Sequence, residues 1–271
     1  MKKKKFAGLI PALVLSLSLM TGCGNAAAAN SVTEAQPQSG TAAEESLFEP
    51  ETAAEESTDE NQASSEATDE NQAAAEQLLM DLTGTYQELW PVVLADKYKQ
   101  LWLDDCAALV GDEIAEAAYE KLISMVTGEI YGEDAAAAYK DGGAAYNCSF
   151  TQGLSILEFD GAASAIKGYD ESGTEIFSHT YHYIGMEEIR GLYEFESDDA
   201  DSGEFTYFCL APDTSDTTYH IEFRYGSDLA ALGQYDAGAY AYWLASGISA
   251  DFDKTMIENC IRLFCTENLS E

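Results

Sequence analysis

The chain has 271 residues, with 13 Lys and Arg against 49 Asp and Glu, so its formal net charge is −36. Because phosphate backbones and anionic lipid surfaces are bound by clustered Lys and Arg, this balance excludes a nucleic-acid-binding protein and a polybasic membrane-surface protein. Hydrophobic residues make up 46% of the chain, which is ordinary for a globular protein and excludes disorder throughout.

Residues 1–23 have the plan of a bacterial secretion signal. Lys2 to Lys5 form a basic segment, and Phe6 to Met20 are almost wholly apolar. The following Thr21-Gly22-Cys23 resembles a lipobox, with Met20 in the place where that motif usually has Leu. The resemblance implies a lipoprotein signal peptide, a lipid on Cys23, and a mature protein anchored to the cell membrane outside the cytoplasm. The alternative is an ordinary signal peptide in which Cys23 is incidental.

Residues 24–77 predict a disordered acidic tether. They contain thirteen acidic residues and no Lys or Arg, and the hexapeptide beginning at Thr58 recurs at Thr68. A repeat this polar has no face to bury, so we expect a solvated, low-complexity spacer extended by its own charge.

Residues 78–271 predict one folded domain, since every Tyr and Trp lies there. Apolar residues recur at helical spacing from Leu89 to Ile123, including Leu109 and Ile114, and again from Phe252 to Phe264. Between them, short aromatic and β-branched runs separated by turns favour antiparallel strands in a barrel or sandwich. The runs are Cys148–Phe150, Leu154–Ile156, Glu175–Ile184, Ile189–Glu196, Glu204–Leu210 and Thr218–Tyr225.

Several motifs resemble the ZinT/YodA family. Asp81-Leu82-Thr83-Gly84-Thr85-Tyr86-Gln87-Glu88-Leu89-Trp90-Pro91 looks like the opening of that domain. His220-Ile221-Glu222-Phe223-Arg224-Tyr225-Gly226 looks like its His-x-His strand, and Tyr240-Ala241-Tyr242-Trp243 like the start of its tail. The resemblance implies an α+β, mainly β fold: a calycin-like (lipocalin-like) antiparallel β-barrel flanked by N-terminal and C-terminal helices. It also implies zinc recruitment for an uptake ABC transporter or its binding protein.

The family's zinc ligands are only partly matched. That site has three imidazoles, and here His220 matches the first member of the His-x-His pair, while Glu222 stands at the second. The position of the earlier imidazole falls at Tyr207 or Phe208. On a strand, His220 and Glu222 face the same side, so they are two candidate Zn²⁺ ligands of the three or four that a firm site needs.

His179 and His182 are weaker metal candidates. Three residues apart on a strand, they face opposite sides and converge only if a bulge intervenes, in which case one of them could complete a site with His220. The alternative is that all three histidines are hydrogen-bonded structural residues.

Besides Cys23, the chain has five cysteines whose pairing the sequence leaves open: Cys106, Cys148, Cys209, Cys260 and Cys265. An extracytoplasmic location permits disulfides, and an odd number leaves at least one thiol unpaired. Cys106 with a cysteine of the last helix, and Cys148 with Cys209, are the plausible pairs.

Aromatic residues supply a second hypothesis. Tyr181, Tyr207 and Trp243 are candidates to line a cavity for a small apolar or peptide ligand in a metal-free barrel. A surface interaction protein is a third possibility. Because the sequence shows no catalytic motif that singles out a nucleophile or an acid–base pair, we expect a binding protein rather than an enzyme.

Overall fold

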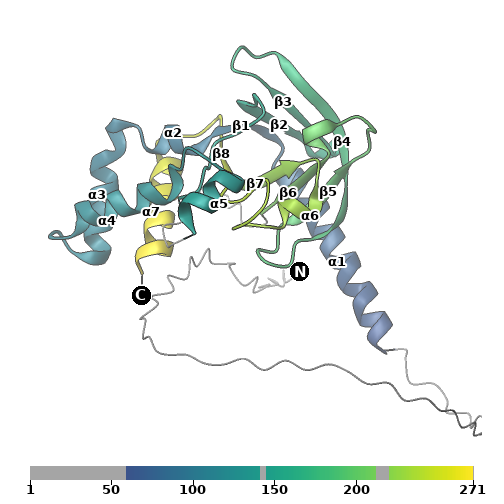
Figure 1. The fold of residues 1–271 in the computed structure, drawn as a ribbon, viewed down its shortest axis with the longest axis horizontal. Helices are drawn as coiled ribbons and strands as arrows, with labels where there is room; N and C mark the ends of the chain where they lie inside the picture. The colour runs from purple at the N-terminus through teal and green to yellow at the C-terminus, as the bar shows by residue number, and fades with distance from the viewer. Residues whose placement is uncertain (1–58, 141–144, 212–219, 271) are drawn as a thin grey trace, which may run out of the picture.

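Eight antiparallel strands follow one another around a closed barrel in the computed structural model, which describes residues 59–140, 145–211 and 220–270 (Figure 1). Each strand pairs with the next along the chain, and β8 pairs with β1 to close the circle. The strands are β1 (Gly84–Glu88), β2 (Ile156–Asp160), β3 (Ala165–Tyr169), β4 (Glu175–Met186), β5 (Tyr193–Ser197), β6 (Tyr207–Leu210), β7 (His220–Gly226) and β8 (Ala245–Ser249). The predicted α+β fold, a barrel flanked by helices, is confirmed.

Aromatic side chains fill the barrel. Alternate residues of each strand point inward, so Leu157 and Phe159 of β2 are buried while their neighbours are half-exposed. Phe195, Phe208 and Phe223 are at most 1% exposed and belong to the same core cluster. Eight strands enclose a space that side chains can fill, and here they do fill it.

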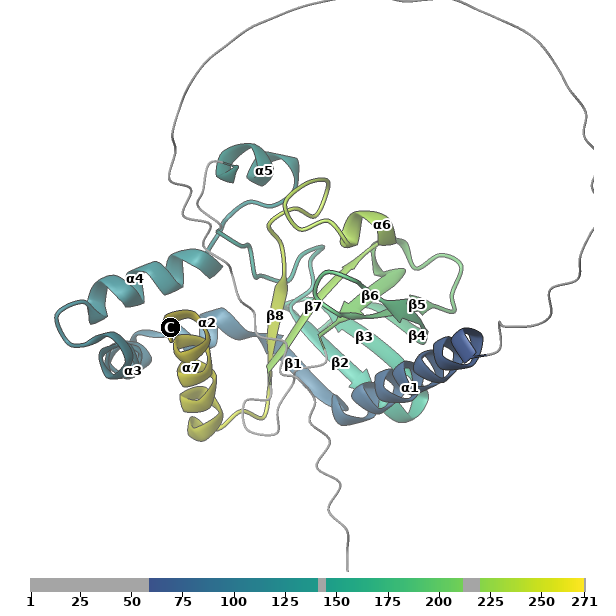
Figure 2. The same ribbon diagram turned by 90° about the horizontal axis from the view of Figure 1, so that it is seen from below.

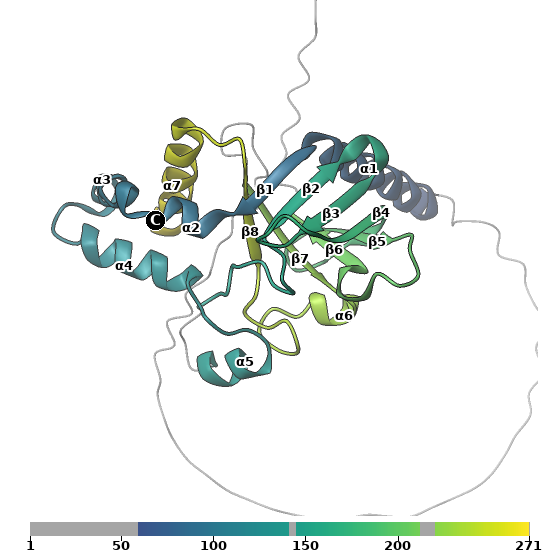
Figure 3. The same cartoon turned by 90° about the horizontal axis from the view of Figure 1, so that it is seen from above.

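Helices form a second core on one side of the barrel, as three views show (Figures 1, 2 and 3). They are α2 (Leu89–Val93), α3 (Lys99–Val110), α4 (Ala115–Val126) and α7 (Lys254–Leu269). Trp90, Trp102 and Phe264 pack together there, with the Trp90 and Phe264 ring centroids 4.9 Å apart. Two short helices, α5 (Glu133–Tyr139) and α6 (Leu229–Leu232), lie in the connecting segments, and 3-10 turns occupy Asp96–Tyr98, Gly161–Ala163 and Gly203–Phe205.

The helical stripe predicted through Leu109 and Ile114 is wrong at these two residues, which are 39% and 54% exposed. The helix α3 ends at Val110, and Gly111 follows with φ of 89°, a conformation that glycine adopts readily. Ile114 is then the residue that precedes α4. The periodicity was therefore continued across a turn.

The helix α1 (Asp59–Asp81) includes residues 59–77, which the sequence predicted as part of the tether. Ala75, Leu78 and Leu79 are buried, and the end of α1 lies against the turn at Gly161–Ala163. A Cβ atom on Gly161 would stand 2.3 Å from the Leu79 carbonyl oxygen, so the approach requires glycine. Residues 24–58 of the predicted tether, and the predicted signal peptide, lie outside the described residues.

The strand boundaries differ from prediction, and the predicted run Leu154–Ile156 overlaps β2 only at Ile156. Residues 148–150 were expected to form a strand but are irregular, with an isolated bridge at Asn147 instead. The strands β1, β3 and β8 were not among the runs. In β3 and β8, Gly, Ala and Ser dilute the β-branched and aromatic content, and β1 ends in the polar residues Gln87 and Glu88. Among the described residues, no helix is both long and apolar enough to cross a membrane.

Candidate functional site

The strand β7 divides its side chains between the barrel core and the helices outside. Ile221, Phe223 and Tyr225 point into the core, whereas His220 and Glu222 point outward and are half-buried. The two candidate ligands therefore share one face, as predicted. The face is the outer one, toward α2 and α7.

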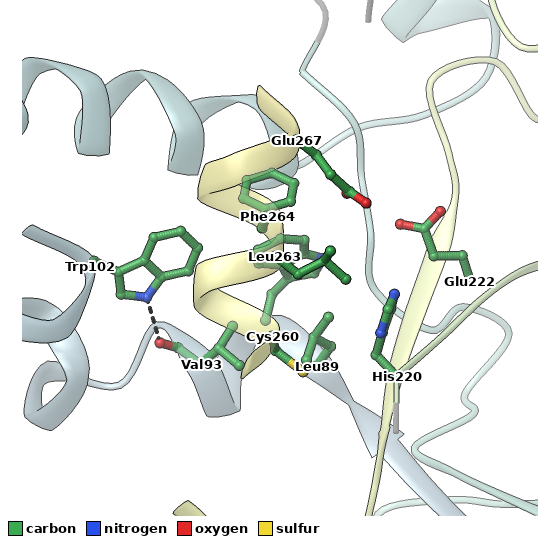
Figure 4. A pocket seen from close by; sticks show the side chains of 10 residues that line it. Leu89, Val93, Trp102, His220, Glu222, Cys260, Leu263, Phe264 and Glu267 are labelled. Atoms are coloured by element: carbon green, nitrogen blue, oxygen red, sulfur yellow. Dashed lines mark hydrogen bonds between the residues drawn. The ribbon is translucent and has the colours of Figure 1, made fainter. Parts of the chain in front are cut away.

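A cavity of about 30 Å³ separates this face from α2 and α7. Figure 4 shows the Glu222 side chain and that of Glu267, near the end of α7, directed toward each other, with His220 beside Glu222. The remaining walls are mostly apolar and are formed by Leu89, Trp90, Val93, Trp102, Cys260, Leu263 and Phe264. Two carboxylates and one imidazole thus face a mainly apolar space.

Ring packing and one buried hydrogen bond hold the apolar wall in place. The Trp102 indole Nε1 donates to the carbonyl oxygen of Val93 over 2.9 Å, and Phe264 makes edge contacts with Trp90 and Trp102. Because these rings come from α2, α3 and α7, they fix the helix that carries Glu267 relative to the barrel.

A second cavity, also of about 30 Å³, adjoins the first, and Trp90, Glu222 and Phe264 line both. It adds the buried Cys148, whose pKa is raised by burial first and by the Glu222 carboxylate second. It also adds Arg190, whose guanidinium lies over the Tyr235 ring at 4.5 Å. The carboxylate of Glu222 therefore lies between the cavity that Glu267 also lines and the cavity that Arg190 also lines.

The donor set suits a divalent cation, since zinc binds imidazole nitrogen and carboxylate oxygen. Within the described ranges, however, no three His, Cys, Asp or Glu side chains are already close enough together to hold a metal ion. His220, Glu222 and Glu267 each make other interactions in the structure as it stands. Their chemistry fits zinc, and their present spacing requires an adjustment before three of them can bind it.

Neither Tyr207 nor Phe208, at the position of the family's earlier imidazole, supplies a ligand beside His220. Phe208 points into the core, and Tyr207 lies on the outside, where its hydroxyl donates to Glu196 Oε1 over 3.3 Å. In the β6–β7 ladder, Tyr207 pairs with Gly226, at the opposite end of β7 from His220.

His179 and His182 lie on β4, which β5 and β6 separate from β7 on one side of the barrel. The Nδ1 atoms of the two imidazoles are each 2.8 Å from a carboxylate oxygen, of Asp199 and Asp198 respectively. The structure does not bring either histidine to His220, and their contacts are those of the structural alternative.

Tyr181 and Trp243 are packing residues of the barrel core. They are 2% and 1% exposed, and each uses its polar atom on a backbone carbonyl, Tyr181 on Phe205 and Trp243 on Ser149. With Tyr207 on the outer surface, none of the three predicted cavity residues lines the cavities described above. Cys23 lies outside the described residues.

Sequence reasoning missed Glu267 and the wall residue Trp90. A signal for Glu267 was present, because it follows Cys260 and Phe264 at helical spacing and therefore shares their face of α7. The surface that Glu267 faces is the outer side of β7, which is set by the tertiary structure and not by the local sequence.

No family model matches the chain, and no curated protein does. In structure, the chain is similar to the Zn(II)-bound ZinT-like domain of Streptococcus pneumoniae AdcA, with 14% identity and a TM-score of 0.42 over 66% of this chain and 87% of that one. It is also similar to Zn(II)-bound AdcA from the same organism, with 15% identity and a TM-score of 0.40 over 66% of this chain and 33% of that one. The first of these structures is named ZinT-like, after the family that residues 81–91 resemble.

Proposed function

We propose that this protein binds zinc outside the cytoplasm, anchored to the cell membrane by a lipid on Cys23, and that it is a binding protein rather than an enzyme. His220, Glu222 and Glu267 are the proposed ligands. The proposal is supported by the facing imidazole and carboxylates of β7 and α7 and by the signal-like residues 1–23.

The volume of the cavity favours a metal ion over an organic ligand. A space of about 30 Å³ accommodates an ion with one water molecule. Pockets for organic ligands are usually about ten times larger, roughly 300 to 1,000 Å³. His220, Glu222 and Glu267 thus face a cavity that has room for an ion but not for an organic ligand.

Binding would draw the ligands together. Zinc–ligand bonds to nitrogen and oxygen are about 2.0–2.2 Å long, and two carboxylates gain most from a cation when it lies between them. Glu267 is near the end of α7, which finishes at Leu269, so a small shift of this last turn would bring its carboxylate toward Glu222. Water is the remaining ligand in this proposal.

The biological role that we propose is delivery of zinc to an uptake transporter or its binding protein. It follows from the motif resemblance and from the proposed anchor at Cys23, which would keep the domain beside the membrane. Three protein ligands leave an open coordination position, which suits transfer of the ion better than permanent storage.

The test is a calorimetric Zn²⁺ titration of residues 24–271, which lack the signal peptide and the lipidated Cys23, together with native mass spectrometry. We expect one zinc per chain with micromolar or tighter affinity, lost in the His220→Ala/Glu222→Ala variant and weakened at least tenfold in Glu267→Gln. Glu258→Gln, on the same helix but paired with Lys254, is the matched control and should bind as the wild type does. Zinc binding that all four proteins share would refute the site.

A second candidate function rests on a wider groove of about 550 Å³ beside α2. Trp90, Pro91 and Leu94 line one side and residues 126–129 and 147–149 the other. The buried Trp90 is the aromatic residue that lines this groove. A chain that fails to bind zinc but shows saturable quenching of tryptophan fluorescence by a small apolar peptide, lost in Trp90→Phe, would favour this function.

A further inference from the structure

Two buried thiols meet at the interface between α3 and α7. The Sγ atoms of Cys106 and Cys265 are 3.9 Å apart, 159 positions apart in the sequence, and both residues are 0% exposed. We infer that Cys106 and Cys265 form a disulfide bond in the mature protein, fastening the last helix to α3.

The bond requires only a small local change. A disulfide has an S–S distance of about 2.05 Å, and rotation about the two Cα–Cβ bonds moves each sulfur by more than the difference needed. The helices α3 and α7 already pack against each other. The rings of Trp102, one turn before Cys106, and Phe264, next to Cys265, are in contact there.

The other described cysteines have different neighbours. Cys148 faces the backbone carbonyl of Tyr146, and Cys209 on β6 stands opposite Glu194 and Arg224 in the ladders. Cys260 lines the cavity at His220. The geometry thus brings Cys106 and Cys265 together, which is one of the pairings that the sequence left open.

The step is a two-electron oxidation by a disulfide-bonded protein oxidant of the extracytoplasmic space. A thiolate of one cysteine attacks the oxidant's disulfide, one oxidant sulfur leaves, and the second cysteine displaces the other from the mixed disulfide. The S–S bond of the protein forms, the S–S bond of the oxidant breaks, and two protons pass from the protein thiols to the reduced dithiol.

The burial of the two thiols determines when the disulfide forms. It is the main cause that raises the pKa of both the Cys106 and the Cys265 thiols, so the folded domain offers little thiolate. The bond should therefore form while the chain folds, before the interface closes. Once formed, the same burial protects it from reductants, which makes it a structural bond rather than a switch.

The test maps thiols in the mature chain after secretion into an oxidising compartment. Under denaturing conditions, free thiols are alkylated without reduction, and the chain is cut with trypsin after Lys and Arg. Cys106 then lies in peptide 100–121, Cys260 in peptide 255–262 and Cys265 in peptide 263–271. We expect a linked pair of 100–121 with 263–271 that separates on reduction.

Alkylated Cys106 and Cys265 in the secreted protein, or a link from either one to peptide 255–262, would overturn the inference. Thermal unfolding gives an independent readout. Reduction should lower the Tm of the wild type by roughly 5–10 °C and leave the Tm of Cys265→Ala unchanged. Cys260→Ala, on the same helix, is the control and should keep the wild-type response. If Cys265→Ala does not fold, the peptide map of the wild type decides.

Discussion

The Glu222 and Glu267 side chains, from β7 and α7, are directed toward each other across a cavity with mainly apolar walls (Figure 4). Like charges that face each other in a half-buried site disfavour the folded chain, and a cation between them reduces that cost. We therefore expect the two carboxylates to lower the stability of the metal-free protein and to raise its affinity for zinc.

Glu267→Gln tests this expectation directly. Removing one charge should raise the Tm of the metal-free chain by about 1–3 °C, while lowering zinc affinity at least tenfold. Thermal scans with a chelator and with excess zinc measure both effects. Glu258→Gln is the control, and a variant that loses both stability and affinity would contradict the expectation.

The burial of the end of α1 predicts that residues 59–77 belong to the domain. A chain that begins at residue 78 loses Ala75 from the core and most of the helix that carries Leu78 and Leu79. We expect its Tm to lie roughly 5 °C or more below that of a chain beginning at residue 59. Equal Tm values would show that residues 59–77 do not stabilise the fold.

Neighbouring residues on β6 separate core packing from surface contact. Phe208 is 0% exposed inside the barrel, whereas Tyr207 lies outside against Glu196. Phe208→Ala should cost about 3–5 kcal/mol of unfolding free energy and Tyr207→Ala about 1 kcal/mol. Urea unfolding measures both, and a larger loss for Tyr207→Ala would contradict the inward and outward assignment.

A buried carboxyl group predicts a pH dependence. Asp105 on α3 has Oδ1 3.9 Å from Arg262 Nε, and its Oδ2 is buried with no hydrogen-bond partner among the described residues. Burial raises the pKa of Asp105 above its ordinary 3.8, and the charge of Arg262 offsets this only in part. The folded state thus binds the proton more tightly than the unfolded state, and this contribution to stability is lost as the pH rises from about 4.

Asp105→Asn should therefore unfold at the same temperature as the wild type near pH 3 and about 1–3 °C higher near pH 7. Thermal scans across this range measure the difference. A difference that shrinks as the pH rises would mean that the Arg262 pair outweighs burial.

Local pattern predicted the elements that carry a strong periodicity of their own. Strands with strong aromatic alternation, such as β4 and β7, and the amphipathic α7 were identified because each carries its own periodicity. The helix α1 was not, since its repeat is polar and only its last turns meet the barrel. The order of strands around the barrel was not predicted, because pairing partners are set by tertiary structure.

The site was only half predictable. His220 and Glu222 are two positions apart on one strand, so their common face followed from strand geometry. Glu267 is 45 positions after Glu222, and nothing local links them; the barrel and α7 bring them together. His179 and His182 attracted attention as histidines, but their neighbours Asp199 and Asp198 could be identified only from the β4–β5 pairing.

The measurement that tests the central claim most directly is the position of zinc in a crystal of the mature chain grown with one equivalent of Zn²⁺. The account predicts one anomalous peak between β7 and α7, with bonds of about 2.0–2.2 Å to a His220 nitrogen and to Glu222 and Glu267 oxygens. A peak elsewhere on the chain, or no peak when zinc is saturating, would contradict it.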